Sequence, residues 1–240
     1  MWYAKNYYGY VDGSTEANTN ALNMANIMYA HGWSKEAVCA AIGNASGGES
    51  NLNPWRWEGE YIPTFSEFSA WSEAEARSHG YGLFQFTPAN KYINQTNANI
   101  YARYYFPHFS DIQGQAADGE AQVMYFTTTG IYDDWMYATT LYQSYYQAFL
   151  NIGVDISGVW GTTLANFLRG TDNNGNALTL AQLTLVFELG YERPGVTFAA
   201  NSYNARKTSA EYYYGFLPNP PQPHQSPKMP FIFYLKHRRY

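Results

Sequence analysis

The stretch Gly43-Asn44-Ala45-Ser46-Gly47-Gly48-Glu49-Ser50-Asn51-Leu52-Asn53-Pro54 marks the place where an apolar helix ends in a single carboxylate. The apolar residues before the end of this helix recur at helical spacing: Ala37, Val38, Ala41, Ile42 and Ala45. Two glycines and Glu49 follow, and Pro54 closes the segment in a turn. A glutamate at a helix C-terminus is unfavourable to the helix dipole, which favours a functional reason for Glu49.

Helices are expected on both sides of this stretch. Apolar positions at helical spacing predict a helix from Ser14 to His31 that Gly32 ends, and Ser34 is a good N-cap for the next helix, which runs to about Gly47. Further helices are expected over 88–98, 118–129 (with Asp118 as cap), 133–151, 160–169, 179–190 and 202–216.

The region from Ser50 to Phe86 has no helical period and predicts a loop-rich lobe with a small hairpin. Within it, Gly80-Tyr81-Gly82-Leu83-Phe84-Gln85-Phe86 is read as a short strand. Alternation would then place Tyr81, Leu83 and Gln85 on one face. Thr87 and Pro88 predict the next helix start. The expected fold class is therefore α+β, predominantly α-helical, with a small β-hairpin lobe.

Composition excludes several functions. A formal net charge of −5 argues against a nucleic-acid binder, because phosphate binding needs a basic face. The single cysteine, Cys39, lies on an apolar helix face and is expected in the core. Aromatic residues make up 19% of the chain, which suits stacking on sugar rings, although most single tyrosines are expected simply to fill half-buried positions.

Three segments are expected along the chain: an N-terminal arm over 1–14, one domain over 15–217, and a tail over 218–240. The N-terminus lacks a charged region followed by an apolar one, and no segment has the length of a membrane span. The tail contains a proline-rich spacer, then Phe231-Ile232-Phe233-Tyr234-Leu235 and a basic end. This apolar strip predicts either a docking segment or a loosely held end.

Glu49 is the main candidate for acid chemistry. Burial against apolar surface raises the pKa of a carboxyl group and keeps it protonated, as a general acid must be. The alternative is an ordinary helix-terminal glutamate. Glu58 and Glu60, just after Trp55 and Trp57, are the candidates for a second carboxylate. Gln85 would bond a sugar hydroxyl or acetamido group, unless its strand simply covers the core.

Other chemistries find little support in the sequence. The histidines are scattered, and one cysteine cannot complete a zinc site by local spacing, so no metal and no cofactor are expected. The segment Asp172-Asn173-Asn174-Gly175-Asn176 is similar to part of a calcium loop but lacks the closing glutamate, and is expected to be a turn. In Tyr191-Glu192-Arg193-Pro194, Tyr191 would face a cleft, or Glu192 and Arg193 would form a surface pair.

Several motifs together resemble the bacteriophage tail lysozyme family, over roughly residues 18 to 216. In order along the chain they are Gly32-Trp33-Ser34-Lys35-Glu36-Ala37-Val38-Cys39, Gly43-Asn44, Gly48-Glu49-Ser50, Asn53-Pro54, Gly80 to Pro88, and Tyr191-Glu192-Arg193-Pro194. The resemblance implies a lysozyme-like fold. It implies that Glu49 is the catalytic acid and that Tyr81, Gln85, Thr87, Tyr191 and Glu192 line a glycan cleft.

The same resemblance implies a virion-associated hydrolase that cleaves the bond between N-acetylmuramic acid and N-acetylglucosamine during phage entry. Its partners would be peptidoglycan glycan strands and other tail proteins, in a virion that acts at the host cell wall. A lytic transglycosylase and an inactive structural tail protein are the alternatives. The chain departs from the pattern in its long acidic loop, which leaves the second carboxylate open, and in Ser46-Gly47-Gly48, whose small side chains predict a loose pocket around Glu49.

Overall fold

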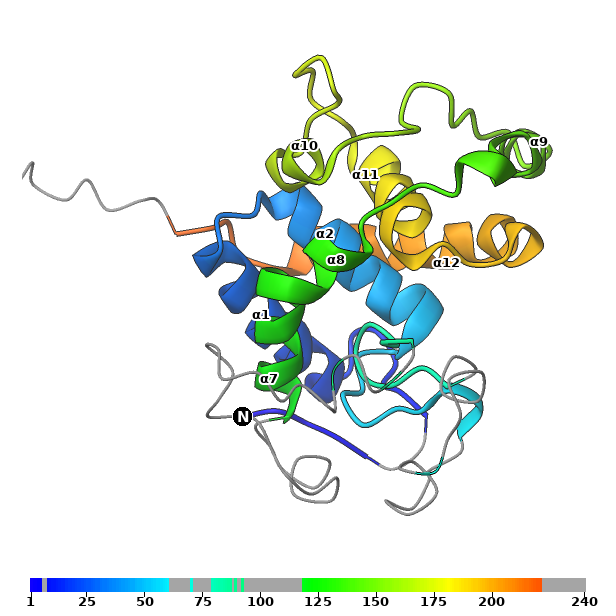
Figure 1. Ribbon diagram of the computed structural model, residues 1–240. Coiled ribbons are helices and arrows are strands. Elements are labelled where there is room, and N and C mark those ends of the chain that lie inside the picture. Colours follow the sequence, from blue (N-terminus) through cyan, green and yellow to red (C-terminus); the bar gives the residue numbers. More distant parts are fainter. Residues whose placement is uncertain are drawn as a thin grey trace, which may run out of the picture.

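The computed structural model describes residues 1–5, 8–60, 70, 79–87, 89, 92 and 118–221. Helices dominate this part of the chain (Figure 1). The α-helices are α1 (Thr15–Ala30), α2 (Lys35–Asn44), α7 (Asp118–Tyr125), α8 (Ile131–Asp134), α9 (Tyr142–Leu150), α10 (Leu164–Arg169), α11 (Leu180–Phe187) and α12 (Val196–Phe216). Short 3-10 turns are η2 (Glu58–Glu60) and η5 (Thr139–Leu141), and wider π turns are η1 (Ala45–Glu49), η4 (Phe126–Gly130) and η6 (Glu188–Glu192).

The first two helices begin as the sequence predicts, but α2 ends at Asn44 and the rest of the predicted helix is the π turn η1. The Ser14 hydroxyl accepts a hydrogen bond from the backbone N–H of Ala17, and Ser34 caps α2 in the same way. Gly32, with a φ of 80°, turns the chain between them in a left-handed conformation that suits glycine. Local capping chemistry therefore fixes this helical pair.

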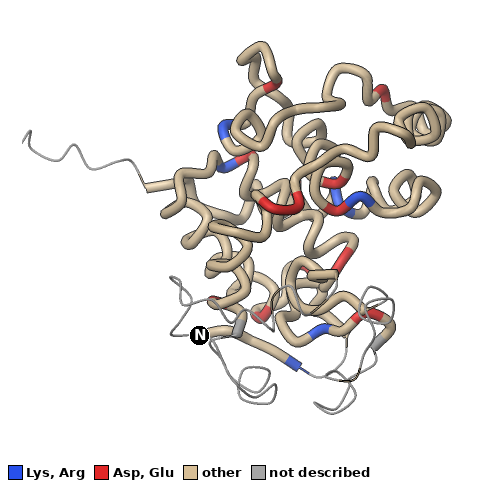
Figure 2. Tube along the Cα trace, viewed as in Figure 1, with Lys and Arg blue, Asp and Glu red and all other residues tan. Residues whose placement is uncertain are grey.

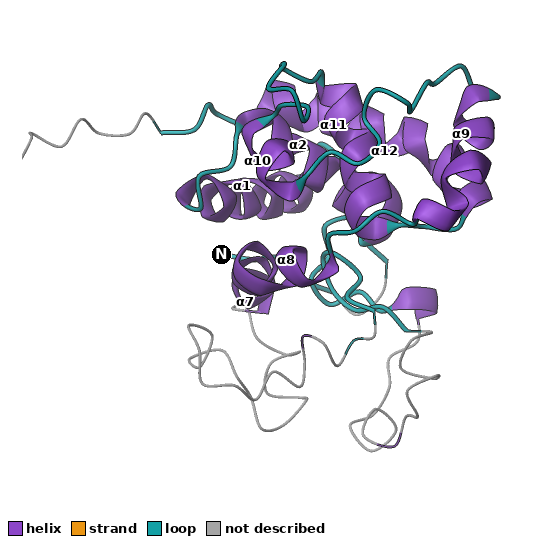
Figure 3. Cartoon of the chain, turned by 45° about the horizontal axis from the view of Figure 1, so that its top comes forward, coloured by secondary structure: helices purple, strands orange, loops and turns teal. Residues whose placement is uncertain are grey.

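The core forms around α2, which lies between α1 and the pair α11 and α12 in both ribbon views (Figures 1 and 3). Every residue of α2 from Ala37 to Asn44 is buried, including Cys39, as its sequence predicts. Because Gly43 has no side chain, Ala210 of α12 packs directly on the α2 backbone. The end of α2 is thus held on several sides.

Later helices differ from their predicted bounds. The helix expected over 133–151 is interrupted, because the N–H of Met136 donates to the carbonyl of Gly190 instead of continuing α8. The helix expected over 202–216 begins earlier, at Val196. The one expected over 179–190 starts with a capping box between Thr179 and Gln182 and then widens into η6. The helix expected over 88–98 falls outside the described residues.

The β-hairpin lobe is not seen in the part of the chain that the structure describes (Figure 3). Only isolated bridges occur there, such as Tyr81 with Phe86. The predicted strand is wrong because Gly82 and Gln85 have φ values of 83° and 44°, which fold the chain into a turn that an extended strand cannot contain. Gly80 and Gly82 indicate a turn in the sequence, whereas the alternation of apolar side chains is coincidental.

The N-terminal residues pack on the helical domain. Asp12 accepts hydrogen bonds from Ser46 at 2.5 Å, Ser209 at 2.5 Å and Tyr213 at 2.7 Å. Asn20 of α1 exchanges hydrogen bonds with the backbone of Tyr3 at 2.9 and 2.8 Å. Because Ser46 belongs to η1, Asp12 ties the segment before α1 to the turn that carries Glu49.

Charged residues are dispersed over the described elements (Figure 2). Lys and Arg do not gather along one face there, in keeping with the net charge of −5. Among the described helices, none has both the length and the apolar content needed to cross a membrane.

Candidate active site

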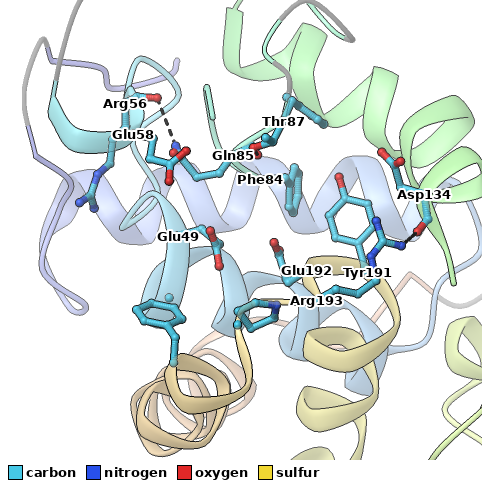
Figure 4. A pocket seen from close by; sticks show the side chains of 15 residues that line it. Glu49, Arg56, Glu58, Phe84, Gln85, Thr87, Asp134, Tyr191, Glu192 and Arg193 are labelled. Carbon is cyan, nitrogen blue, oxygen red and sulfur yellow. Dashed lines mark hydrogen bonds between the residues drawn. The ribbon is translucent and has the colours of Figure 1, made fainter. Parts of the chain in front are cut away.

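A pocket of about 470 Å³ lies beside the end of η1 (Figure 4). Two groups of residues face each other across it. The helical wall consists of Gly48, Glu49, Tyr191, Glu192, Arg193, Pro194, Gly195 and Phe198, with Asp134 at its edge. The loop wall consists of Arg56, Glu58, Phe84, Gln85, Phe86 and Thr87. The volume of the pocket falls in the usual range for a ligand site.

Two π turns shape the helical wall. In η1 the N–H of Ser50 donates to the carbonyl of Ala45, and in η6 the N–H of Arg193 donates to the carbonyl of Glu188. Each turn takes in one extra residue and ends on a pocket glutamate, Glu49 or Glu192. Since π turns inside helices cluster at functional sites, this pairing supports the pocket as the site.

Behind the helical wall, Arg206 of α12 forms ion pairs with both Glu49 and Glu188. Its guanidinium lies 2.6 Å from Oε1 of Glu49 and 3.2 Å from Oε1 of Glu188, with the Arg206 side chain fully buried and Glu49 16% exposed. Its remaining hydrogen bonds go to Asn44 of α2, at 2.9 Å, and to Ser202, at 3.2 Å. Burial opposes its charge, but Glu49, Glu188 and Glu192 raise the pKa of Arg206 and keep it a cation.

The glycines before Glu49 serve close packing. A β-carbon on Gly47 would lie 2.6 Å from the backbone of Arg206, and one on Gly48 would overlap the Arg206 guanidinium. The sequence-based expectation that Ser46-Gly47-Gly48 loosens the pocket is therefore wrong. The absence of side chains at Gly47 and Gly48 lets α12 approach, so that Arg206 reaches Glu49.

The electrostatics of Glu49 combine two opposing effects. Burial raises the pKa of Glu49, whereas the charge and hydrogen bond of Arg206 lower it. The net direction is upward, with a further small rise from the charge of Glu58. A carboxyl group with a raised pKa and an exposed edge suits proton donation near neutral pH.

The two acids of η6, Glu188 and Glu192, also have raised pKa values. Burial raises the pKa of Glu188 to about 7, although Arg206 opposes this rise. Burial also raises the pKa of Glu192 well above its usual range, with the charge of Glu49 as the next cause. One oxygen of each group, Oε2 of Glu188 and Oε1 of Glu192, is buried without a hydrogen-bond partner among the described residues.

The loop wall is held by backbone hydrogen bonds. The N–H of Gly80 donates to Oε2 of Glu58 at 2.8 Å, while the amide of Gln85 donates to the carbonyls of Gly82 at 2.9 Å and Arg56 at 3.2 Å. Gln85 itself has a left-handed backbone, with a φ of 44°. The amide nitrogen of Gln85 thus fixes the turn, and Thr87 continues the wall with its hydroxyl bonded to the carbonyl of Gln85 at 2.8 Å.

Gln122 of α7 anchors this wall from behind. It is fully buried, accepts from the N–H of Leu83 at 2.7 Å, and donates to the carbonyl of Pro54 at 2.6 Å. One side chain therefore joins the segment after η1 to the turn that carries Gln85.

Aromatic side chains pack together behind Tyr191 of the helical wall and Phe84 of the loop wall. Tyr191 packs on Phe126 at 5.0 Å and on Phe187 at 5.1 Å between ring centroids. Phe84 stacks on Phe126 at 3.7 Å. Phe126 begins η4, whose Thr127 hydroxyl bonds back to the carbonyl of Val123 at 2.8 Å, a contact that competes with regular helix geometry. Burial raises the pKa of Tyr191 well above its ordinary value, so its hydroxyl stays neutral.

The predicted site residues divide into three groups. The structure brings Glu49, Glu58, Gln85, Thr87, Tyr191 and Glu192 to the pocket. Tyr81 lies in the core instead, fully buried with its ring 4.6 Å from that of Trp57, so it supports the loop wall from behind. Glu60 ends η2, but its side chain falls outside the described part.

Sequence reasoning missed Arg206, Glu188 and Gln122. A signal for Arg206 existed: it occupies a helical stripe of otherwise uncharged buried residues in α12, together with Ala199, Tyr203, Ala210 and Tyr213. An arginine in such a stripe needs a buried acid as partner. No comparable local signal marks Glu188 or Gln122.

Among the described residues, no three His, Cys, Asp or Glu side chains are arranged to hold a metal ion. The loop at Asp172 is a turn, as expected: its carboxylate accepts from the N–H groups of Asn174 and Asn176, both at 2.8 Å.

A mainly helical domain whose pocket is lined by carboxyl groups is consistent with a lysozyme-like protein. Residues 19–217 match the phage tail lysozyme family, and the chain belongs to that family. It is also similar to Morphogenesis protein 1 of Bacillus phage B103, with 33% identity over 99 residues. That match covers 41% of this chain and 23% of the relative, so the chain spans only a part of the relative's length.

Proposed function

We propose that this protein is a virion-associated peptidoglycan hydrolase. It cleaves the β-1,4 bond between N-acetylmuramic acid and N-acetylglucosamine in the host cell wall during phage entry. The observation that carries the proposal is the carboxyl group of Glu49, which is 16% exposed at the pocket and has its pKa raised by burial. Membership in the phage tail lysozyme family supports the same reaction.

In this proposal Glu49 protonates the leaving oxygen of the glycosidic bond. Glu58, on the loop wall across the pocket, acts as nucleophile or as the base that activates water. Glu60 remains a further candidate for this second role. Gln85, Thr87, Tyr191 and Glu192 would contact the sugar rings, and the raised pKa of Tyr191 keeps its hydroxyl able to donate a hydrogen bond.

A lytic transglycosylase is the second candidate. The observation that favours it is the environment of Glu58, which is exposed and has one carboxylate oxygen bonded to the N–H of Gly80. A transglycosylase needs only one acid, which later acts as base while the C6 hydroxyl of muramic acid closes an anhydro ring. Glu49 alone would suffice for that reaction.

Mass spectrometry of the products distinguishes these reactions. Purified sacculi are incubated with the protein, and the masses of the released fragments are measured before and after chemical reduction of their sugar ends. The hydrolase yields reducible muramic acid ends. A transglycosylase yields anhydro ends, lighter by one water and resistant to reduction. Glycan strands that stay intact would instead indicate an inactive structural tail protein.

A further inference from the structure

The helical wall holds more carboxyl groups than one general acid requires. Glu49 ends η1 and Glu192 ends η6, so two separate π turns each bring an acid to the same pocket (Figure 4). The two acids differ in their partners. Glu49 is bonded to Arg206 at 2.6 Å, whereas Oε1 of Glu192 is buried with no hydrogen-bond partner among the described residues.

The local charge does not balance if every acid ionises. Glu49, Glu188 and Glu192 all act on the single guanidinium of Arg206, so three anions would face one buried cation. Arg193 contributes a weaker positive influence on Glu192, but its guanidinium is bonded to the carbonyl of Asp134. On the loop wall, Glu58 raises and Arg56 lowers the pKa of Glu49. Neighbouring carboxylates in a buried site retain a proton for this reason.

We infer that Glu192 is a second acid group of the reaction, which shares one proton with Glu49 and so supplies the proton for the glycosidic oxygen. This inference rests on the proposed function. It gives Glu192 a part in proton transfer in addition to contact with the sugar.

The two acids can donate one proton and recover one in each reaction cycle. In the resting enzyme, Glu49 and Glu192 carry one proton between them. Protonation of the glycosidic oxygen breaks its bond to C1 and leaves both carboxyl groups as anions. Two anions in one partly buried pocket form a stronger base than one, and they recover a proton from the water or sugar hydroxyl that attacks C1. The pair returns to its initial state with no further reactant.

The surroundings of Glu49 and Glu192 support different roles for the two carboxyl groups. Burial, followed by the charge of Glu49, raises the pKa of Glu192 well above its usual range, so Glu192 holds the shared proton at neutral pH. Arg206 draws Glu49 toward its anion, against the effect of burial. When a sugar oxygen arrives, Glu49 donates to it from the exposed edge of its carboxyl group, and Glu192 keeps the proton available to Glu49.

The pH profile of a Glu192→Gln variant tests the inference. Glutamine keeps the shape but cannot hold the shared proton, so Glu49 must then bind a proton alone beside Arg206. We expect the alkaline limb of the kcat/KM profile on purified glycan strands to move down by at least ~1 pH unit, which corresponds to about tenfold in protonated fraction. Activity should recover at lower pH, where Glu49 becomes protonated again. A loss of equal size at every pH would overturn the inference.

Two controls keep the result specific. Glu211→Gln removes one negative charge from an exposed position on α12, and its profile should superimpose on that of the wild type. The second control uses no cleavage at all: carboxyl carbon shifts are followed by NMR in wild-type protein and assigned with the Glu192→Gln variant. Glu192 should remain protonated at neutral pH. An ionised Glu192 there would refute the shared proton even if Glu49 proves to be the catalytic acid.

Discussion

The two walls of the pocket are held in opposite ways. In the helical wall, Glu49 is fixed through a buried charge, Arg206, and two π turns set its direction and that of Glu192. In the loop wall, Glu58 and Gln85 are fixed through backbone groups of Gly80, Gly82 and Arg56. The comparison shows that ion pairs between side chains stabilise the helical wall, whereas turn geometry and backbone hydrogen bonds stabilise the loop wall. The two walls should therefore respond differently to mutation and to pH.

Removal of the buried cation should have the largest effect on stability. Arg206→Met leaves Glu49 and Glu188 buried without their partner, which typically costs about 3–5 kcal/mol. Burial already raises the pKa of both carboxyls above the unfolded value, and loss of the cation, which lowers both, would raise them further. Their contribution to stability is present below the unfolded pKa and is lost as pH rises through the folded one. Because the pKa of Glu188 is already about 7 with Arg206 in place, its share of the deficit should grow as pH rises above about 7 in urea melts.

Lys207→Met is the matched control for Arg206→Met. It removes a cation from the adjacent, half-buried position of α12, and its free energy of unfolding should stay within ~0.5 kcal/mol of the wild type. An Arg206→Met variant as stable as this control would mean that the helical wall does not depend on the buried charge.

Glu58 tests whether the loop wall takes part in the chemistry. If Glu58 acts as nucleophile or base, Glu58→Ala should lower kcat by about 10²-fold, with little change in melting temperature because the side chain is exposed. Added azide, a small external nucleophile, should then restore turnover and yield a glycosyl azide. Full activity of Glu58→Ala with anhydro products would favour the transglycosylase and limit the chemistry to the helical wall.

Gly48→Ala tests the close contact behind the acid. The new methyl group would overlap the Arg206 guanidinium, which four hydrogen-bonded or ionic partners hold in place. Overpacking of this kind costs about 1–3 kcal/mol, and thermal or urea unfolding would measure it. Gly158→Ala, where an added β-carbon meets open space, is the control and should behave like the wild type. Equal stability of the two variants would show that α12 can shift away from η1.

The C-terminal tail should have the smallest effect on the pocket. Pro218 and Asn219 contact α1 and α2 through Tyr29 and Lys35, and the apolar strip from 231 to 235 falls outside the described residues. We propose that the tail docks on another virion protein, so deletion of 220–240 should leave glycan cleavage by the free protein near normal and reduce incorporation into particles. Quantitative immunoblots of purified particles check this. Wild-type copy number would remove the docking proposal.

The sequence predicted the helical wall better than the loop wall. Residues Ser14 and Ser34 gave correct helix starts because capping is local, and Glu49 stood out because an acid at a helix end conflicts with the helix dipole. The turn at Gly82 was mistaken for a strand because its apolar residues alternate by chance. Arg206 was missed because its partners lie far away along the chain, at Asn44 and Glu49.

The most direct test of the central claim is the rate at which Glu49→Gln releases muropeptides from purified sacculi. Glutamine preserves the size of the side chain but cannot donate the proton, so we predict a loss of at least ~10²-fold. A melting temperature near that of the wild type would show that the variant is folded. A folded Glu49→Gln variant that degrades sacculi as fast as the wild type would contradict the assignment of this pocket as the site of glycan cleavage.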